Sequence, residues 1–322
     1  MPAPESGKRS IPPQTESPPA RAKGSQALPL PLRAVKLMLN GVERLSPRLA
    51  ARVLLPLMFR TRRGKPSPRE QALLAGGERW EFAGPRGKLV AHRFGRGERA
   101  VVLMHGWNGR GGQLGEFIAP LLSRGYQVVS FDAPGHGESP GNEASMIAFA
   151  DTFDRVVAAV RESGANVHGV IAHSLGAAAV TLSEFRRLRA ARHGGNQRGV
   201  GSLVFVAPPI DVREWVDEFV ASFALSRRTE HVLRGMVQAR VGYRLADLYA
   251  PDMAREMRAP LLVLHDADDR AVPLQCGQAL AAAWPKARLT TSSGLGHVRI
   301  LRDDASIRQA VEFIGLVRDE HS

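Results

Sequence analysis

From residue 79 onward, short apolar runs alternate with longer stretches in which apolar residues recur every three or four positions. Six of the short runs are almost continuously apolar: AVVLMHG (100–106), YQVVSFDA (126–133), NVHGVIAHS (166–174), GSLVFVAPP (201–209), PLLVLHDA (260–267) and ARLTTSSG (287–294). Strands buried on both faces have this character, so the runs predict a parallel sheet covered by helices. Before them, RWEF and KLVAHRFG predict an antiparallel pair with a turn at Gly84 and Pro85.

The longer stretches have the spacing of amphipathic helices. In residues 145–163, one apolar stripe can pack on a sheet, and it consists of Ile147, Ala150, Phe153, Val156, Val157 and Val160. Because strand and helix patterns alternate along the chain, we expect an α/β fold with a mostly parallel, doubly wound sheet. Residues 75–210 and 259–318 are expected to form this core.

One connection is too long to be a simple loop. About 50 residues of mainly helical pattern lie between the run ending at Pro209 and the run starting near Pro260. We therefore expect residues 211–258 to form a helical cap. Its first helix, DVREWVDEFVASFAL, carries an apolar stripe of Val212, Trp215, Val216, Phe219 and Phe223. This stripe can seat the cap on the core, and Trp215, Phe219 and Phe223 are also candidates for lining a substrate pocket.

The N-terminal part of the chain differs from the rest. Residues 1–30 are rich in Pro, Ser and charge and have no apolar signal-peptide segment, so we expect a disordered leader. Residues 31–70 predict basic amphipathic helices, with ten basic and two acidic residues between Arg33 and Glu70. Packing on the main domain with a solvated basic rim is expected, and weak peripheral contact with an anionic membrane is the alternative. Nucleic acid is not an expected partner, because the sequence has no recognised nucleic-acid-binding motif.

Composition favours a globular, cytoplasmic protein. Of the 322 residues, 44% are hydrophobic and 23% charged, which allows a large core despite a formal net charge of +13. The single cysteine, Cys276, excludes an intramolecular disulfide and a CxxC metal site. No apolar run reaches the ~18–20 residues that a membrane-spanning helix requires. The oligomeric state is left open by the sequence.

Polar residues gather at the C-terminal ends of the predicted parallel strands, where open α/β sheets bind ligands. Ser174 follows one run, several acids follow another in HDADDRAVP, and His297 lies in GLGHVRI. A serine needs a base to become a nucleophile, and the base needs an orienting group. The chain order Ser, Asp, His supplies these groups. Ser174 also lies at a sharp strand-to-helix junction between Ala172 and Gly176, whose small size suits such a turn.

Five motifs in sequence order resemble the α/β-hydrolase family over roughly residues 75–318: HGW, DAPGHGES, AHSLGA, DADDRAVP and GLGH. The one departure is Ala172, where the family's G-x-S-x-G motif has its first glycine. The resemblance implies that Ser174 is the nucleophile and His297 the general base and acid. It also assigns the oxyanion hole to the backbone N–H groups of Trp107 and Leu175.

The acid must be chosen from a crowded motif. Asp266, Asp268 and Asp269 follow the same predicted strand, and Asp211 follows the preceding one. The family's pattern places the acid three residues before the valine of a Val-Pro pair, here Val272, which points to Asp269. We therefore expect Asp269 to orient His297.

Other polar residues have structural interpretations. His105, His173, Asp132 and His136 are expected to pack or to hold loops by hydrogen bonds rather than to act on a substrate. The segment GWNGRGG lacks both GxxxxGK[ST] and GxGxxG, so a nucleotide is not expected. Neither a metal nor a cofactor is predicted, because no His, Asp or Glu group has zinc-site spacing.

The sequence thus predicts a serine hydrolase that cleaves a small-molecule carboxylic ester or thioester through an acyl-enzyme. An acyltransferase or a cofactor-free peroxidase with the same three residues is one alternative. A non-catalytic ligand-binding member of the fold is another, although a receptor needs no activated nucleophile.

Overall fold

The computed structural model describes residues 39, 41–84, 87–194 and 199–316. The leader expected over 1–30 lies outside them, as do residues 31–38 of the predicted basic segment and Pro85 of the predicted turn. Among the described residues, no helix is both long and apolar enough to cross a membrane.

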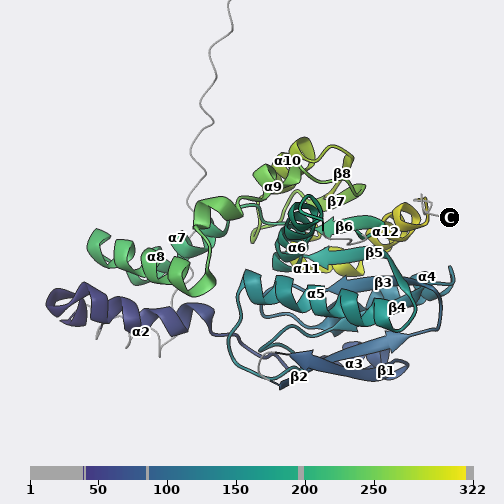
Figure 1. Ribbon diagram of the computed structural model, residues 1–322, viewed down its shortest axis with the longest axis horizontal. Coiled ribbons are helices and arrows are strands. Elements are labelled where there is room, and N and C mark those ends of the chain that lie inside the picture. The colour runs from purple at the N-terminus through teal and green to yellow at the C-terminus, as the bar shows by residue number, and fades with distance from the viewer. Residues whose placement is uncertain (1–38, 40, 85–86, 195–198, 317–322) are drawn as a thin grey trace, which may run out of the picture.

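An eight-stranded sheet forms the centre of the molecule, with strand order β1-β2-β4-β3-β5-β6-β7-β8 (Figure 1). The strands are β1 (Glu78–Gly84), β2 (Gly87–Phe94), β3 (Arg99–Met104), β4 (Gln127–Phe131), β5 (Asn166–His173), β6 (Ser202–Val206), β7 (Leu261–Asp266) and β8 (Ala287–Ser292). β1 pairs antiparallel with β2, and β2 with β4, whereas all pairs from β4 to β8 are parallel. This arrangement confirms the predicted mostly parallel α/β fold.

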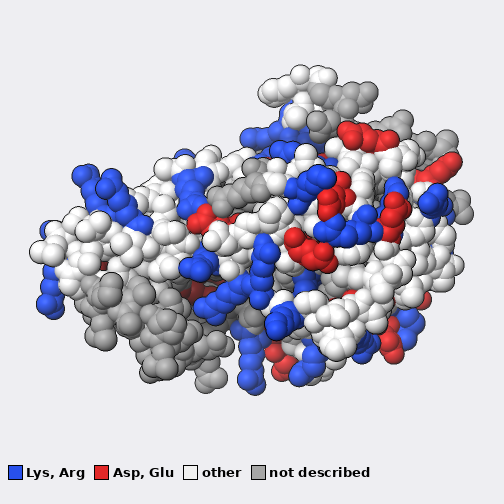
Figure 2. All heavy atoms as spheres, turned by 90° about the horizontal axis from the view of Figure 1, so that it is seen from below, with Lys and Arg blue, Asp and Glu red and all other residues white. Residues whose placement is uncertain are grey.

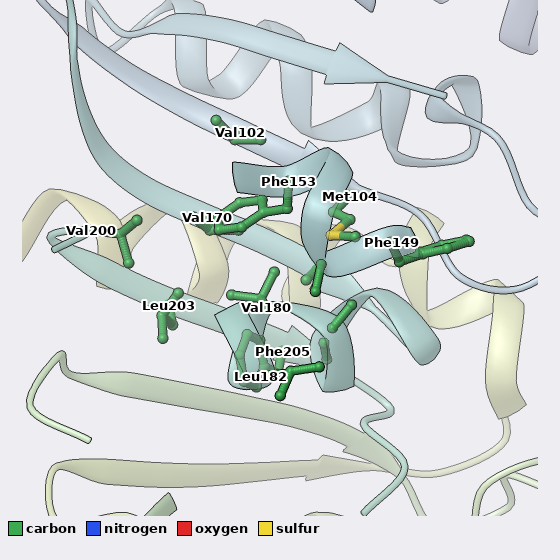
Figure 3. Close-up of a cluster of buried hydrophobic side chains, with 14 of the residues drawn as sticks. Val102, Met104, Phe149, Phe153, Val170, Val180, Leu182, Val200, Leu203 and Phe205 are labelled. Atoms are coloured by element: carbon green, nitrogen blue, oxygen red, sulfur yellow. The ribbon is translucent and has the colours of Figure 1, made fainter. Parts of the chain in front are cut away.

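Helices cover both faces of the sheet. One face packs against α5 (Met146–Glu162), α6 (Leu175–Ala191), α9 (Ala250–Ala254) and α10 (Leu274–Ala283). The other packs against η1 (Gly111–Phe117), α4 (Ile118–Leu122), η3 (Ile300–Arg302) and α12 (Asp304–Leu316). Successive strand residues point to opposite faces, so Val102 and Met104 join the first layer while Val101 and Leu103 join the second. Figure 3 shows the first layer, where Phe149 and Phe153 of α5 lie over the strands.

The N-terminal helix packs on the inserted helices rather than on the sheet. α2 (Pro47–Phe59) shares a buried apolar cluster with α7 (Val212–Phe223) and α8 (Arg227–Val241), and the three lie together at one end of the molecule (Figure 1). The expected packing on the main domain is wrong for α2, because its apolar face matches that of the insertion. α3 (Pro68–Ala75) instead contacts the core, where buried Glu70 pairs with Arg110 at 2.7 Å.

Helices fill the connection between β6 and β7, in the order α7, α8, η2 (Leu245–Leu248) and α9. Only the first part stands away from the core. The residues from Leu248 to Met257 pack in the same cluster as α6 and α10. The helical layer that lies beside α2 is therefore shorter than the predicted cap over 211–258.

Candidate active site

Ser174 lies on a sharp turn between β5 and α6, with backbone angles φ 51° and ψ −125°. Such positive φ values are unfavourable for a residue with a side chain, so the surrounding packing must impose the conformation. Two glycines make room for it. A Cβ atom on Gly176 would lie 2.5 Å from the carbonyl oxygen of His105, and one on Gly106 would lie 2.9 Å from the Cβ of Ser174. Ala172 is fully buried in β5, where its small side chain fits.

Three side chains from separate elements form one hydrogen-bonded chain. The Ser174 hydroxyl lies 3.0 Å from Nε2 of His297, and Nδ1 of His297 lies 2.7 Å from Oδ2 of Asp269. His297 lies on the short helix α11 (Gly296–Arg299), which follows β8. An ionised Asp269 only accepts hydrogen bonds, so it fixes the proton on Nδ1 and leaves Nε2 free to accept the serine proton.

Asp269 is held in its ionised form. Burial opposes ionisation, but the hydrogen bonds from His297 and from the backbone N–H groups of Val272 and Ala271 lower the pKa of Asp269 below its ordinary value. Its second oxygen, Oδ1, accepts both backbone bonds at 2.8 and 2.9 Å. The carboxylate is therefore oriented by its own loop, with Oδ2 directed at the imidazole.

The other three candidate acids have different partners. Asp266 accepts hydrogen bonds from Ser292 Oγ and from the backbone of Gly296 at 2.9 Å, which ties the β7 end to the loop carrying His297. Asp268 accepts from the Gly294 N–H at 2.8 Å. Asp211 caps α7 and pairs with Arg213 at 2.6 Å. Of the four candidate acids, only Asp269 lies within hydrogen-bond distance of the His297 ring.

The backbone N–H groups of Trp107 and Leu175 have no hydrogen-bond partner among the described residues. Leu175 is the first residue of α6, where helix N–H groups lack intrahelical acceptors and attract negative charge. Trp107 is followed by Asn108 in the left-handed region at φ 55°. The Asn108 N–H donates to Nε2 of His136 at 2.9 Å, and this bond fixes the backbone next to Trp107.

The buried histidines near the Ser174 turn are neutral and form hydrogen bonds with neighbouring loops. Nε2 of His105 accepts from the Ala133 N–H at 3.0 Å, and burial lowers its pKa to about 4. Burial and the neighbouring His105 lower the pKa of His136 to about 3. Asp132, whose pKa is raised by burial, accepts from the Gly111 and Glu138 N–H groups. These bonds join the loop after β3 to the loop after β4.

The sequence interpretation missed a contribution from the segment that follows α2. Thr61 donates to the carbonyl of Gly135 at 2.8 Å, and the Arg62 N–H donates to Oδ1 of Asn108 at 2.8 Å. Arg63 donates to the carbonyls of Ser139 and Gly141. The segment therefore fastens both loops beside Trp107. The basic run around Arg62 was visible in the sequence, but its partners are backbone carbonyls that carry no sequence signal.

An apolar cavity of about 250 Å³ opens beside Ser174 and His297. Most of its lining is aliphatic or aromatic and comes from several elements, including Phe59, Trp107, Met146, Ile147, Leu175, Ile210, Val212, Trp215, Val216, Val237, Leu245, Leu248 and Val272. The acidic residues Asp211, Glu214 and Glu218 also line it, whereas no Lys or Arg among the described residues does.

Of the three aromatic residues predicted for the pocket, Trp215 lines the cavity but Phe219 and Phe223 do not. They lie one and two turns farther along α7, roughly 6 and 12 Å beyond Trp215, where the helix has passed the core. There they contact each other, with ring centroids 4.9 Å apart, and pack in the cluster shared with α2 and α8. Their prediction as pocket residues is corrected accordingly.

Comparison with known proteins matches residues 101–309 to a model of the alpha/beta hydrolase family. The chain belongs to this family. A pimeloyl-[acyl-carrier protein] methyl ester esterase of Methylococcus capsulatus is 28% identical over 228 residues, which cover 60% of this chain and 85% of that protein.

The chain is also similar to solved structures of the same fold. An esterase of Pyrococcus furiosus has a TM-score of 0.59 and 18% identity, covering 81% of this chain and 97% of its own. A monoacylglycerol lipase of Paleococcus ferrophilus has a TM-score of 0.54 and 22% identity, and the match covers 70% of this chain and 98% of the lipase. At these identities the two structures establish the shared fold.

Proposed function

We propose that this α/β hydrolase cleaves a carboxylic ester or thioester through an acyl-enzyme on Ser174, with His297 as base and acid and Asp269 as its orienting partner. The observation that carries the proposal is the chain of hydrogen bonds from Ser174 through His297 to Asp269 at the wall of an apolar cavity. The similarity to esterases supports the same reaction class.

The proposed steps follow from this geometry. Ser174 Oγ attacks the substrate carbonyl carbon while its proton passes to Nε2 of His297. The N–H groups of Trp107 and Leu175 stabilise the resulting oxyanion, a type of donor whose loss reduces turnover by about 100- to 1000-fold. The imidazolium then gives its proton to the departing alkoxide or thiolate. Water, activated by the same imidazole, releases the carboxylic acid and restores the Ser174 hydroxyl.

The cavity disfavours an anionic acyl group. Its lining is mainly aliphatic and aromatic, and no Lys or Arg among the described residues lines it to pair with a carboxylate or phosphate. Transferring an unpaired charge into such a site is strongly unfavourable. We therefore infer that the acyl chain held in the cavity carries no negative charge.

A covalent probe tests the proposal. A fluorophosphonate should label the wild-type chain but not the Ser174→Ala variant, and Ser174→Ala should lose several orders of magnitude in hydrolysis of p-nitrophenyl esters while remaining folded. A parallel series of p-nitrophenyl esters and acyl-CoA thioesters of graded chain length separates ester from thioester preference. Adding an alcohol acceptor or hydrogen peroxide distinguishes acyl transfer and peroxidation from hydrolysis. Wild-type turnover in Ser174→Ala, or no labelling of the wild type, contradicts the proposal.

A further inference from the structure

Exposed arginine and aliphatic side chains lie together on the outward face of α2 and on the segment just before it. Three of the six exposed large hydrophobic side chains among the described residues lie in one short segment: Leu45 is 87% exposed, Leu49 49% and Val53 43%. Each is preceded directly by an exposed arginine, namely Arg44, Arg48 and Arg52. The result is a band of alternating arginine and aliphatic side chains, which we call the Arg-aliphatic band.

The band lies opposite the face that holds α2 in place. Ala50, Ala51, Leu54 and Met58 are buried against α7 and α8, and the helical repeat turns Leu49 and Val53 away from them. Fold stability therefore does not account for the exposed Leu and Val side chains. A solvated helix face is normally polar, so an exposed aliphatic row marks a contact surface.

The acids of the described residues do not neutralise the charges of the band. Among the described residues, none of Arg44, Arg48 and Arg52 forms a salt bridge. The nearest acid in sequence, Glu43, accepts a hydrogen bond from the Ser226 N–H at 2.7 Å. Figure 2 shows mainly basic and uncharged side chains over the end of the molecule that α2 forms, while the visible acidic side chains gather toward the other end.

We propose that the Arg-aliphatic band seats the protein on the surface of an anionic lipid membrane. Such a surface offers negatively charged headgroups to the arginines and an acyl region to Leu45, Leu49 and Val53. A nucleic acid would match the arginines but would leave the aliphatic row in water. The proposal is independent of the function proposed for Ser174.

Membrane contact at this position would bring the cavity close to lipid. Phe59, the last residue of α2, lines the cavity and lies edge-on to Trp215, with ring centroids 6.1 Å apart. Val53 precedes Phe59 by six positions, which is roughly 9 Å along the helix axis. The docked band therefore lies on the same helix as one residue of the cavity wall, less than two helical turns from it.

The test compares two surface variants of the full chain by co-sedimentation with vesicles. One variant combines Arg44→Gln, Arg48→Gln and Arg52→Gln. Its control combines Arg155→Gln, Arg258→Gln and Arg308→Gln, which removes the same charge from exposed positions outside the band. Each basic residue at an anionic surface contributes roughly a fivefold gain in partitioning. We expect the first variant to bind phosphatidylserine-containing vesicles roughly 100-fold more weakly, and the control to bind within about threefold of wild type.

A third variant, Leu45→Ser with Leu49→Ser and Val53→Ser, keeps all charges and tests the apolar half of the band. It should bind at least tenfold more weakly, because each aliphatic side chain favours leaving water. All variants should keep the wild-type melting temperature. The proposal would be overturned if wild type failed to bind phosphatidylserine vesicles, or if the arginine variant and its control lost binding equally. Unchanged vesicle binding of the serine variant together with tight binding of wild type to duplex DNA would point to a nucleic acid instead. A dimer in solution that the serine variant dissociates would point to a second copy of the chain.

Discussion

The ring of His173 is hydrogen-bonded to the main chain of His297: Nε2 of His173 lies 2.9 Å from the carbonyl oxygen of His297. A carbonyl oxygen only accepts, so Nε2 carries the proton. Burial, reinforced by the nearby His297, lowers the pKa of His173 to about 3, and the ring is neutral at physiological pH. The residue next to Ser174 therefore holds the backbone of the loop that presents His297.

Removing this bond should loosen His297 without removing any group that reacts. In His173→Phe the carbonyl of His297 loses its donor, so we expect kcat on a p-nitrophenyl ester to fall by roughly tenfold or more with little change in KM. His173→Gln, whose amide can donate to the same carbonyl, should recover most of that loss. The melting temperature of both variants serves as the control. Wild-type kcat in His173→Phe would rule out the positioning role.

The four candidate acids can be ranked by turnover. Asp269→Asn removes the charge that stabilises the imidazolium and allows the wrong tautomer, so kcat should fall by about 10⁴-fold. Asp268→Asn loses one exposed loop contact with Gly294 and should stay within about tenfold of wild type. Asp211→Asn affects the first turn of α7 and should behave like Asp268→Asn. More than a tenth of wild-type activity in Asp269→Asn, combined with an inactive Asp211→Asn, would move the acid to the end of β6.

Asp266→Asn should also lose activity, but because the loop that carries His297 loses hydrogen bonds. Asp266 accepts hydrogen bonds from Ser292, Leu295 and Gly296, and these bonds outweigh burial and lower its pKa. An amide has one acceptor oxygen instead of two, so the loop carrying His297 should lose order and the melting temperature should drop along with kcat. Asp269→Asn should reduce kcat with the smaller change in melting temperature. The two variants are therefore separated by differential scanning calorimetry.

Gly176 is required by the backbone opposite it. A Cβ at this position would meet the main-chain oxygen of His105 at 2.5 Å, and a backbone atom cannot swing aside as a flexible side chain can. Gly176→Ala should push α6 away from the loop that carries Trp107 and reduce kcat by at least tenfold. Gly235→Ala, at an α8 position where a Cβ meets nothing within 4 Å, is the matched control and should keep wild-type activity. Full activity in Gly176→Ala would show that the loop can move.

The sequence predicted those parts of the site that depend on local chain order. Nearly continuous apolar runs predicted five buried strands correctly, whereas ARLTTSSG, with few apolar residues, forms the partly exposed edge strand β8. Residues that follow strands within a few positions, such as Ser174 and Asp269, must lie at one edge of a parallel sheet. The packing partner of α2 was predicted wrongly because amphipathicity shows that a face is buried, not against what. The contacts of Thr61 and Arg63 were missed for a related reason, since their acceptors are carbonyls more than 70 positions away.

Buried neutral histidines predict a steep loss of stability in mild acid. The folded pKa of His105 is about 4 and those of His136 and His173 about 3, against an ordinary value of 6.5. Below pH ~6.5 the unfolded chain binds protons that the folded chain does not, so each histidine lowers the unfolding free energy by about 1.4 kcal/mol per pH unit as pH falls. Asp132, whose pKa burial raises, acts in the opposite sense above pH ~4.

Urea unfolding at a series of pH values between about 7.5 and 5 measures this slope. The pKa of buried His265 is also lowered by burial, and that of Asp154 is raised by burial. With four histidines against two aspartates, we expect a loss of several kcal/mol across the range, enough to unfold a domain of ordinary stability. His136→Gln should reduce the slope by about one proton. An unfolding free energy that stays constant from pH ~7.5 to ~5 would contradict the buried neutral state of these rings.

The two faces of α2 should respond differently to truncation. Leu54 is fully buried between α2 and the inserted helices, so Leu54→Ala should lower the unfolding free energy by roughly 2–4 kcal/mol through lost burial and the cavity left behind. Leu49, which is 49% exposed on the Arg-aliphatic band, should tolerate the same change with less than about 1 kcal/mol. Urea unfolding of both variants in the absence of lipid measures the difference. If Leu54→Ala is as stable as wild type, α2 does not pack on α7 and α8 in solution, and its whole apolar content becomes available for membrane contact.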